Sequence, residues 1–261
     1  MVSLYRTERV LIAGLPIDPL TPAEACQRFD DFIQEGRAHS IIFCEANLFV
    51  QAIRSPHIMQ TIESASLVLA DGVSLTLASY LIGKPLSARL PGPSVMLLYC
   101  KHGVERGLKH FFYGGAPGVT ARLADNLSKQ IPGLRVAGTY SPPFRPLTEE
   151  EDLDVKKRIE ESSADVLWVG LGAPKQELWI TEHLDRIRVP LMLGVGAAFD
   201  FHSGTKPWAP KLIRVIGLEW AWRMFITGGP RIFQRGIDVL PAFIHIIFRD
   251  AVLHHWRRFN D

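Results

Sequence analysis

Short apolar runs alternate with amphipathic segments along most of the chain. Six of the runs have the length and the β-branched or aromatic content of buried strands: residues 40–44, 67–70, 110–113, 134–139, 166–169 and 191–193. Strands that alternate with helices pair in parallel, and helices then cover both faces of the sheet. The pattern therefore predicts an α/β fold with a Rossmann-like parallel sheet.

Three helices can be placed from local signals. Residues 21–24 have the sequence Thr-Pro-Ala-Glu, which combines a capping residue, a first-turn proline and an acidic residue. Residues 148–151 have the sequence Thr-Glu-Glu-Glu, which is typical of a capping box. A third helix is predicted from about Pro117 to Lys129.

Small and polar residues follow the ends of the predicted strands. They are Asn47, Asp71, Gly72, Gly114, Gly115, Gly170, Gly172, Gly194 and Gly196. Ligands of parallel sheets bind outside the carboxyl ends of the strands, and glycine turns let the backbone approach a phosphate closely. One shared site at this edge is expected. Tight strand-to-helix connections without a ligand remain the alternative for any single turn.

Several polar side chains have both a functional and a structural interpretation. Asp71 is either a catalytic carboxylate or an aspartate that caps a helix or turn. Asn47 likewise has either a functional or a structural role. Arg89 either binds a phosphate or is a solvated loop cation. Gln176 and Glu177, which follow Pro174, lie either near the site edge or at the start of a surface helix.

Two further residues complete the candidates. Asp200, which follows the small residues Ala197 and Ala198, is either a ligand contact or a structural hydrogen-bond acceptor. Tyr140 lies just after a predicted strand.

Composition narrows the function classes. The chain has 261 residues with 47% hydrophobic and 21% charged residues, so it can bury a large core, and its net charge of +2 gives no reason to expect nucleic acid. No P-loop, complete dinucleotide fingerprint, zinc motif or nucleophile elbow is present. Because no zinc motif is present, no tightly bound structural metal is expected. Three widely spaced cysteines favour a reducing compartment.

The C-terminal part has a different character. Between Trp208 and Asp261 there are eight Lys or Arg residues against four acidic ones, with many aromatics among them. Extra helices packed on the main domain would explain this composition. A surface that contacts anionic lipid would explain it too. No secretory signal and no apolar run long enough to span a bilayer is recognisable, so a peripheral or soluble protein is expected.

Ordered motifs connect the chain to a known family. They are residues 70–73 (ADGV), 83–86 (GKPL), 112–115 (FYGG), 170–177 (GLGAPKQE), 194–200 (GVGAAFD), 217–220 (GLEW) and 230–231 (PR). Over nearly the whole chain, this series resembles the WecG/TagA/CpsF glycosyltransferases, glycosyltransferase family 26.

The resemblance implies an inverting enzyme that moves a sugar from a UDP-sugar to a polyprenyl-diphosphate-linked saccharide in cell-surface polysaccharide synthesis. It implies a catalytic α/β domain over residues 1–205 and a membrane-proximal helical appendage over residues 206–261. It also implies a cytoplasmic, peripheral enzyme at the inner face of the cell membrane. No cofactor or metal is expected, because the UDP-sugar is a substrate.

The resemblance also assigns roles. The family's proposed general base falls on Asp71, and its conserved Asn, Arg and Gln fall on Asn47, Arg89 and Gln176. Together with the residues at the strand ends, the expected substrate-binding set is Glu45, Asn47, Gly72, Arg89, Gly114, Gly115, Tyr140, Gly172, Gln176, Glu177, Gly196 and Asp200. Arg223, Arg231 and Arg235 match arginines of the appendage that would hold the lipid diphosphate.

Two positions depart from the family pattern. Glu45 stands where members often have Thr, and Ser94 stands where they often have Asp. Both are expected near the sugar, so we expect the donor or acceptor to differ from those of N-acetylmannosamine transferases. A nicotinamide-dependent oxidoreductase and a non-catalytic, membrane-docked sugar-nucleotide-binding protein are the alternatives. The sequence predicts no oligomeric state.

Overall fold

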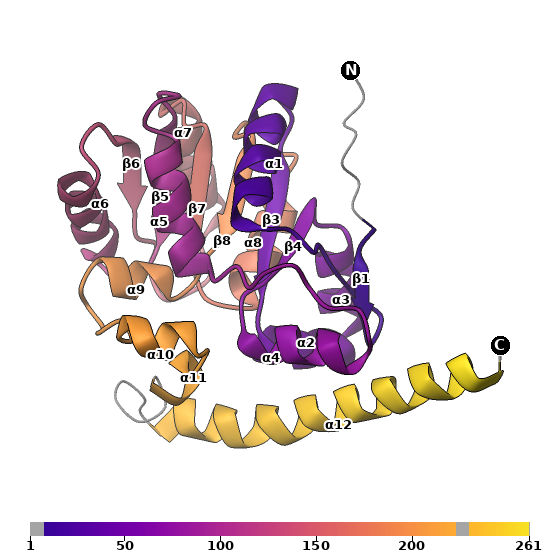
Figure 1. Ribbon diagram of the computed structural model, residues 1–261. Helices are drawn as coiled ribbons and strands as arrows, with labels where there is room; N and C mark the ends of the chain where they lie inside the picture. The colour runs from indigo at the N-terminus through magenta and orange to yellow at the C-terminus, as the bar shows by residue number, and fades with distance from the viewer. Residues whose placement is uncertain (1–7, 223–229, 261) are drawn as a thin grey trace. The chain divides into compact units, whose positions relative to one another are not determined.

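A computed structural model of the chain describes residues 8–222 and 230–260. The chain, whose helices and strands are drawn in Figure 1, forms two compact units that interleave along the sequence. Unit 1 contains residues 1–22, 44–91 and 209–261, and unit 2 contains residues 23–43 and 92–208. The sequence predicts another division, between a catalytic domain that ends at residue 205 and a helical appendage, and this division stays a prediction.

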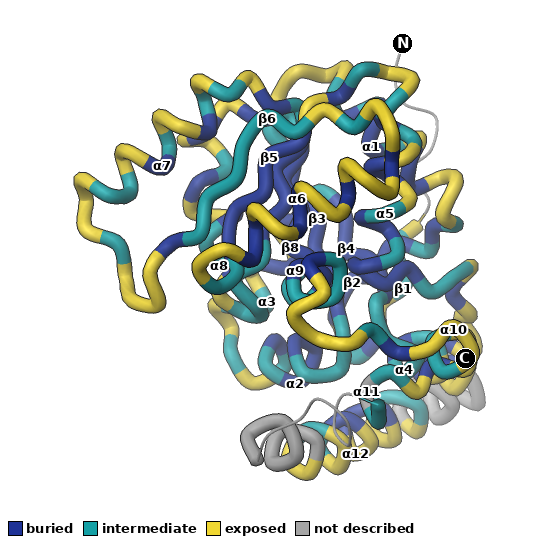
Figure 2. The backbone as a smooth tube through the Cα atoms, turned by 90° about the vertical axis from the view of Figure 1, so that its left-hand side faces the viewer, coloured by how far each residue is buried: buried dark blue, intermediate teal, exposed yellow. Residues whose placement is uncertain are grey.

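A parallel sheet forms the centre of the fold. Its strand order is β4-β3-β8-β7-β5-β6. The strands of unit 2 are β3 (His39–Cys44), β8 (Leu191–Gly194), β7 (Val166–Gly170), β5 (Lys109–Gly114) and β6 (Arg135–Tyr140), and their pairs are parallel. Residues 166–169 of β7 are fully buried, and Figure 2 shows the labelled strands β3, β5 and β8 as largely buried too. Burial on both faces explains why the strands are continuous apolar runs. The predicted α/β class is confirmed.

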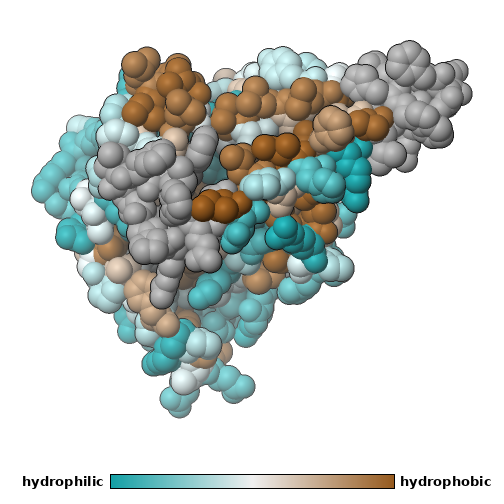
Figure 3. All heavy atoms as spheres, turned by 90° about the horizontal axis from the view of Figure 1, so that it is seen from below, coloured by the Kyte–Doolittle hydropathy of each residue, from teal (hydrophilic) through white to brown (hydrophobic). Residues whose placement is uncertain are grey.

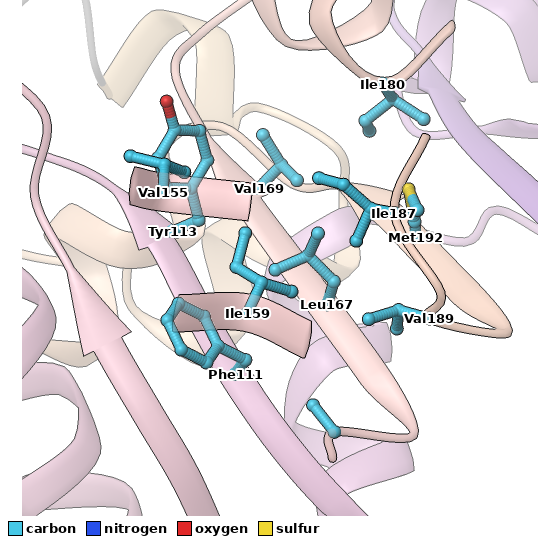
Figure 4. Packing of buried hydrophobic residues seen from close by; sticks show 11 residues of the cluster. Phe111, Tyr113, Val155, Ile159, Leu167, Val169, Ile180, Ile187, Val189 and Met192 are labelled. Carbon is cyan, nitrogen blue, oxygen red and sulfur yellow. The ribbon is translucent and has the colours of Figure 1, made fainter. Parts of the chain in front are cut away.

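Helices cover both faces of this sheet. The helices of unit 2 are α1 (Pro22–Glu35), α5 (Gly92–His102), α6 (Val119–Gln130), α7 (Glu149–Glu161), α8 (Lys175–His183) and α9 (Ala198–His202). On one face, Phe111 of β5 joins residues of α7 and α8 in a buried cluster (Figure 4). On the other face, the ring of Phe112 lies 6.2 Å from that of Phe199 in α9. The alternation of neighbouring β5 side chains between the two faces follows from strand geometry.

Helix α7 begins as its sequence predicts. The Thr148 hydroxyl accepts a hydrogen bond from the Glu151 amide at 3.2 Å, and the Glu151 carboxylate accepts one from the Thr148 amide at 2.9 Å. This reciprocal pair satisfies two amides that a helix start leaves without intrahelical partners. Helix α1 begins at the predicted Pro22, and α6 begins two residues after the predicted Pro117.

Unit 1 is built around an antiparallel hairpin and strand β4. Its elements are β1 (Val10–Ile12), β2 (Leu15–Ile17), α2 (Ala46–Arg54), α3 (Pro56–Glu63), β4 (Leu67–Ala70), α4 (Val73–Leu81), α10 (Lys211–Val215), α11 (Glu219–Trp222) and α12 (Pro230–Asn260). The carboxylate of Asp18 accepts hydrogen bonds from the Val68 amide at 2.7 Å and from Arg9 at 3.1 Å. These bonds tie the chain after the hairpin to the middle of β4.

Helix α12 is held to unit 1 by an apolar face and one hydrogen bond. Phe243, Ile246 and Ile247 are buried, and the Phe243 ring lies 5.2 Å from that of Phe49 in α2. One turn further along, the Asp250 carboxylate accepts a hydrogen bond from the Ala13 amide at 2.7 Å. The C-terminal segment therefore forms part of the core of unit 1. Among the described helices, none combines the length and the apolar content that crossing a bilayer requires.

Candidate active site

The first group of predicted site residues surrounds the end of β4 in unit 1. Asp71 directly follows this strand, and its amide donates a hydrogen bond to the Cys44 carbonyl at 2.9 Å. The Ala70 carbonyl accepts a hydrogen bond from the Leu90 amide at 2.8 Å. Both bonds involve the peptide group between Ala70 and Asp71, so they fix the backbone that leads into Asp71, and they bring the loop that carries Arg89 beside it.

Glu45 and Asn47 lie next to the same turn. The Glu45 carboxylate caps α2 by accepting hydrogen bonds from the Asn47 amide at 2.9 Å and the Leu48 amide at 3.1 Å. A side chain added at Gly72 would place its Cβ 3.8 Å from the Cβ of Glu45. The structure therefore brings Glu45, Asn47, Asp71 and Gly72 together.

Asp71 does not act as a helix cap for α4. The N-cap position of α4 is Gly72, and no side-chain hydrogen bond caps this helix. The carboxylate is half-buried at the carboxyl end of a strand, which is where ligands of parallel sheets bind. The structural interpretation as an N-cap of α4 is therefore ruled out.

Arg89 is held by the C-terminal segment and is not a solvated loop cation. Its guanidinium pairs with the Glu219 carboxylate at 3.1 Å and also donates to the Arg214 carbonyl. The two paired side chains are only 19% and 18% exposed, which strengthens the pair relative to a surface salt bridge. The sequence motif around Glu219 contributed to the family resemblance, but it did not reveal this pairing.

Gly217 brings the same segment against the start of α4. Its φ is +77°, and an added Cβ would lie 2.6 Å from the Cβ of Val73. Only glycine permits both this conformation and this close approach. The segment from α10 to α11 thus contacts both the loop of Arg89 and the helix that begins after Asp71 and Gly72.

The second group of predicted site residues comprises the glycine turns of unit 2. The Gly115 amide donates a hydrogen bond to the Gly170 carbonyl at 2.9 Å, which joins the ends of β5 and β7. A Cβ at Gly114, whose φ is +130°, would lie 2.5 Å from the same carbonyl oxygen. Gly172 has a φ of +79°, and nothing lies within 4 Å of where its Cβ would be. The turn at Gly114 and Gly115 therefore leaves no room for a side chain at Gly114, whereas the turn at Gly172 has free space beside it.

Gln176 connects two of these turns. It is only 4% exposed, its amide oxygen accepts a hydrogen bond from the Gly172 amide at 3.1 Å, and its amide nitrogen donates to the Glu177 carboxylate at 2.8 Å. A Cβ at Gly194 or Gly196 would lie 3.1 Å or 3.4 Å from the Gln176 side chain. Gln176 and Glu177, which is 1% exposed, therefore lie in a buried first turn of α8 near the strand ends and not at an exposed helix start.

The remaining candidate site residues lie outside these two groups. Tyr140 is half-buried at the end of β6, with the Arg158 guanidinium carbon 5.6 Å from the centre of its ring. Asp200 forms an ion pair with Lys206, which agrees with a structural role. Arg231 and Arg235 lie in the first turns of α12, and Arg223 lies outside the described residues. Within residues 8–222 and 230–260, no group of three or more metal-ligating side chains is gathered.

The close approach at Gly114 gives a stability prediction. Gly114→Ala should lower the free energy of unfolding by about 3 kcal/mol, because it adds both a clash and an unfavourable φ. Gly118→Ala is the matched control, since its φ is +78° with nothing within 4 Å, and it should cost only about 1–2 kcal/mol. Urea denaturation of both variants measures the difference. Equal losses would contradict the proposed clash with Gly170.

The family assignment follows from comparison with known proteins. A sequence profile of the WecG/TagA/CpsF glycosyl transferase family matches residues 10–257. The chain belongs to this family. The match includes both groups of site residues and the segment that holds Arg89, so the chain is a glycosyltransferase.

Relatives in two bacteria carry a specific name. A protein of Bacillus spizizenii is 27% identical over 226 residues, which cover 87% of this chain and 83% of that protein. One from Staphylococcus aureus is 28% identical over 222 residues, which cover 84% of this chain and 85% of that protein. Both are named N-acetylglucosaminyldiphosphoundecaprenol N-acetyl-beta-D-mannosaminyltransferase.

Proposed function

We propose that this WecG/TagA/CpsF family member is an inverting glycosyltransferase. It transfers a hexose or N-acetylhexosamine from a UDP-sugar to a polyprenyl-diphosphate-linked saccharide during synthesis of a cell-surface polysaccharide. The observation that carries the proposal is the fixed position of Asp71 at the end of β4, beside Glu45, Asn47 and the loop of Arg89. The names of the relatives, which specify an undecaprenol-linked acceptor, support the acceptor class.

Asp71 supplies the general base. A sugar hydroxyl is a poor nucleophile until its proton is removed. The Asp71 carboxylate takes this proton while the acceptor oxygen bonds to the anomeric carbon of the donor. The bond between that carbon and the diphosphate breaks, and UDP leaves with the electron pair. One direct displacement of this kind inverts the anomeric configuration.

Backbone amides and arginine stabilise the leaving group. Negative charge grows on the diphosphate as the bond breaks, so donors that are already in place lower the barrier. The open turn at Gly172 leaves room for a phosphate beside the backbone. Arg89 is oriented by Glu219 and supplies a delocalised positive charge.

The lipid part of the acceptor places the reaction at a membrane surface. The enzyme acts from the cytoplasm at the inner face of the cell membrane, and Arg223, Arg231 and Arg235 hold the lipid diphosphate. Charge-assisted bonds from arginine suit phosphate oxygens. The UDP-sugar is a substrate, so the reaction uses no cofactor, and it requires no metal.

Glu45 bears on the identity of the sugar. Its carboxylate caps the N-terminus of α2, and its Cβ lies close to Gly72, so a negative charge stands in this region where family members often have Thr. With Ser94, it favours a sugar that differs from N-acetylmannosamine, such as glucose or another hexose.

A binding experiment separates this function from the oxidoreductase alternative. Thermal unfolding with UDP should raise Tm by several degrees, since a ligand at 100 times its Kd stabilises the folded state by about 2.7 kcal/mol. NAD at the same concentration should leave Tm unchanged. Stabilisation by NAD alone would contradict the proposal. A panel of UDP-sugars with a short-chain polyprenyl-diphosphate acceptor, followed by UDP release, then identifies the donor and excludes a non-catalytic binding protein.

A further inference from the structure

Helix α4 has a buried and an exposed apolar face. Leu75, Ala78 and Ile82 are buried against unit 1. On the opposite side, Leu77, Tyr80 and Leu81 are 58%, 62% and 60% exposed. The three exposed residues occupy positions i, i+3 and i+4, and the exposed Lys84 follows one turn later. They therefore form a single stripe along the helix.

Two other helices of unit 1 expose apolar side chains as well. In α10 and its C-cap, Leu212, Val215 and Ile216 are between 53% and 73% exposed. In α12, apolar residues beside its buried face are exposed at helical spacing: Ile237, Leu240, Ile244, Phe248 and Val252. Figure 3, which views the face that lies below in Figure 1, shows apolar side chains gathered in neighbouring patches on this side. Exposed apolar surface of this extent marks an interaction site.

We propose that the exposed stripe of α4, formed by Leu77, Tyr80, Leu81 and Lys84, inserts into the interfacial layer of a lipid bilayer. The lipid surface would then contact the helix that follows Asp71 in addition to the C-terminal helices of the same unit. The proposal rests on the lipid-linked acceptor of the proposed function.

The composition of the surface favours lipid over a protein partner. Tyrosine is enriched at membrane interfaces, where its ring is apolar and its hydroxyl remains wet. Lys84 can bury its aliphatic part and keep its ammonium group at the headgroups. Helix α4 contains no charged residue, and the exposed charged residues of α10, α12 and the end of α4, within their described parts, are Lys84, Lys211, Arg249 and Asp238. The excess of cations suits anionic headgroups.

The position of α4 in the chain gives the contact a functional consequence. The helix begins at Val73, two residues after Asp71. A bilayer that holds α4 would also fix the height of the catalytic carboxylate above the membrane. The acceptor saccharide, attached to its lipid by a diphosphate, would then meet Asp71 at a set distance from the headgroups.

A vesicle-binding experiment tests this inference on the full chain. The double variant Leu77→Ser/Leu81→Ser should lower the partition coefficient onto phosphatidylglycerol and phosphatidylcholine vesicles by at least about tenfold, given the apolar area that two leucines bury. Leu98→Ser/Leu153→Ser is the control, because these leucines are also exposed, at 39% and 58%, but belong to unit 2. It should bind vesicles as the wild type does.

A fluorescent label gives a second readout that does not depend on activity. Cys26, Cys44 and Cys100 are buried, so a cysteine introduced at an exposed position reacts selectively. An environment-sensitive dye on Leu81→Cys should shift to shorter wavelength when vesicles are added, whereas the same dye on Leu153→Cys should not.

Three outcomes would overturn the inference, and they are distinguishable. Equal vesicle binding by the wild type and Leu77→Ser/Leu81→Ser would remove α4 from the contact and leave the proposed function intact. A wild-type dimer that the double variant converts to a monomer would make this face an interface between two copies. Absence of vesicle binding by the wild type would contradict the membrane location in the proposed function as well.

Discussion

Replacing Asp71 by Asn should lower kcat for sugar transfer by about 10²–10⁴-fold, the contribution typical of a general base. The amide has nearly the same shape as the carboxylate, but it cannot accept the proton of the acceptor hydroxyl. The backbone bonds from Asp71 to Cys44 and from Leu90 to Ala70 do not involve the carboxylate. The Kd for UDP should therefore remain within about threefold of the wild-type value, which is less than 1 kcal/mol. Steady-state kinetics and calorimetric titration with UDP measure the two effects.

The matched control for Asp71→Asn is Asp165→Asn. The Asp165 carboxylate accepts a hydrogen bond from the Lys109 amide at the amino ends of β5 and β7, so it lies at the opposite edge of the sheet from the site. Transfer by this variant should be unchanged. Near-normal turnover by Asp71→Asn would remove Asp71 as the base.

Replacing Arg89 by Gln should lower kcat/KM by about 10²–10³-fold, the loss expected when one donor to a developing negative charge is removed. Arg89 has two possible duties, which are to stabilise the diphosphate and to hold the C-terminal segment through Glu219. Glu219→Gln removes the charge of the partner but can keep one hydrogen bond to the guanidinium. If Arg89 acts on the substrate, Glu219→Gln should cost no more than about tenfold, which is about 1.4 kcal/mol.

The comparison of the two variants decides between these duties. Equal losses in kcat/KM for Arg89→Gln and Glu219→Gln, with a matching decrease in thermal stability, would mean that Arg89 serves only to hold the segment from α10 to α11. A loss confined to Arg89→Gln, with Tm unchanged, supports a direct role at the diphosphate.

The sheet was predictable because its strands are buried on both faces. Apolar runs such as 166–169 differ sharply from the polar segments beside them, and the structure has strands at all six predicted positions. The hairpin of β1 and β2 was not predicted, because two three-residue strands separated by two residues leave too short a pattern. The position of α12 was also not predictable, since Phe243 and Asp250 contact Phe49 and Ala13, which lie 194 and 237 positions away along the chain.

The positions of the candidate site residues could be predicted from the sequence, but the residues that they contact could not. Strand ends followed by glycine or a carboxylate identified Asp71, Gly114 and Gly172 as candidates. The pairing of Arg89 with Glu219 joins residues 130 apart, and no local pattern reveals it. The burial of Gln176 depends on the absence of side chains at Gly194 and Gly196, which becomes visible only once β7 and β8 are paired.

The most direct test of the central claim is the mass of the lipid product. Wild-type protein, a UDP-sugar from the donor panel and a short-chain polyprenyl-diphosphate saccharide should yield a lipid that has gained one sugar residue. One UDP should be released for each product, and Asp71→Asn should form almost none under the same conditions. Release of UDP without any glycosylated lipid, or equal product from wild type and Asp71→Asn, would contradict the account.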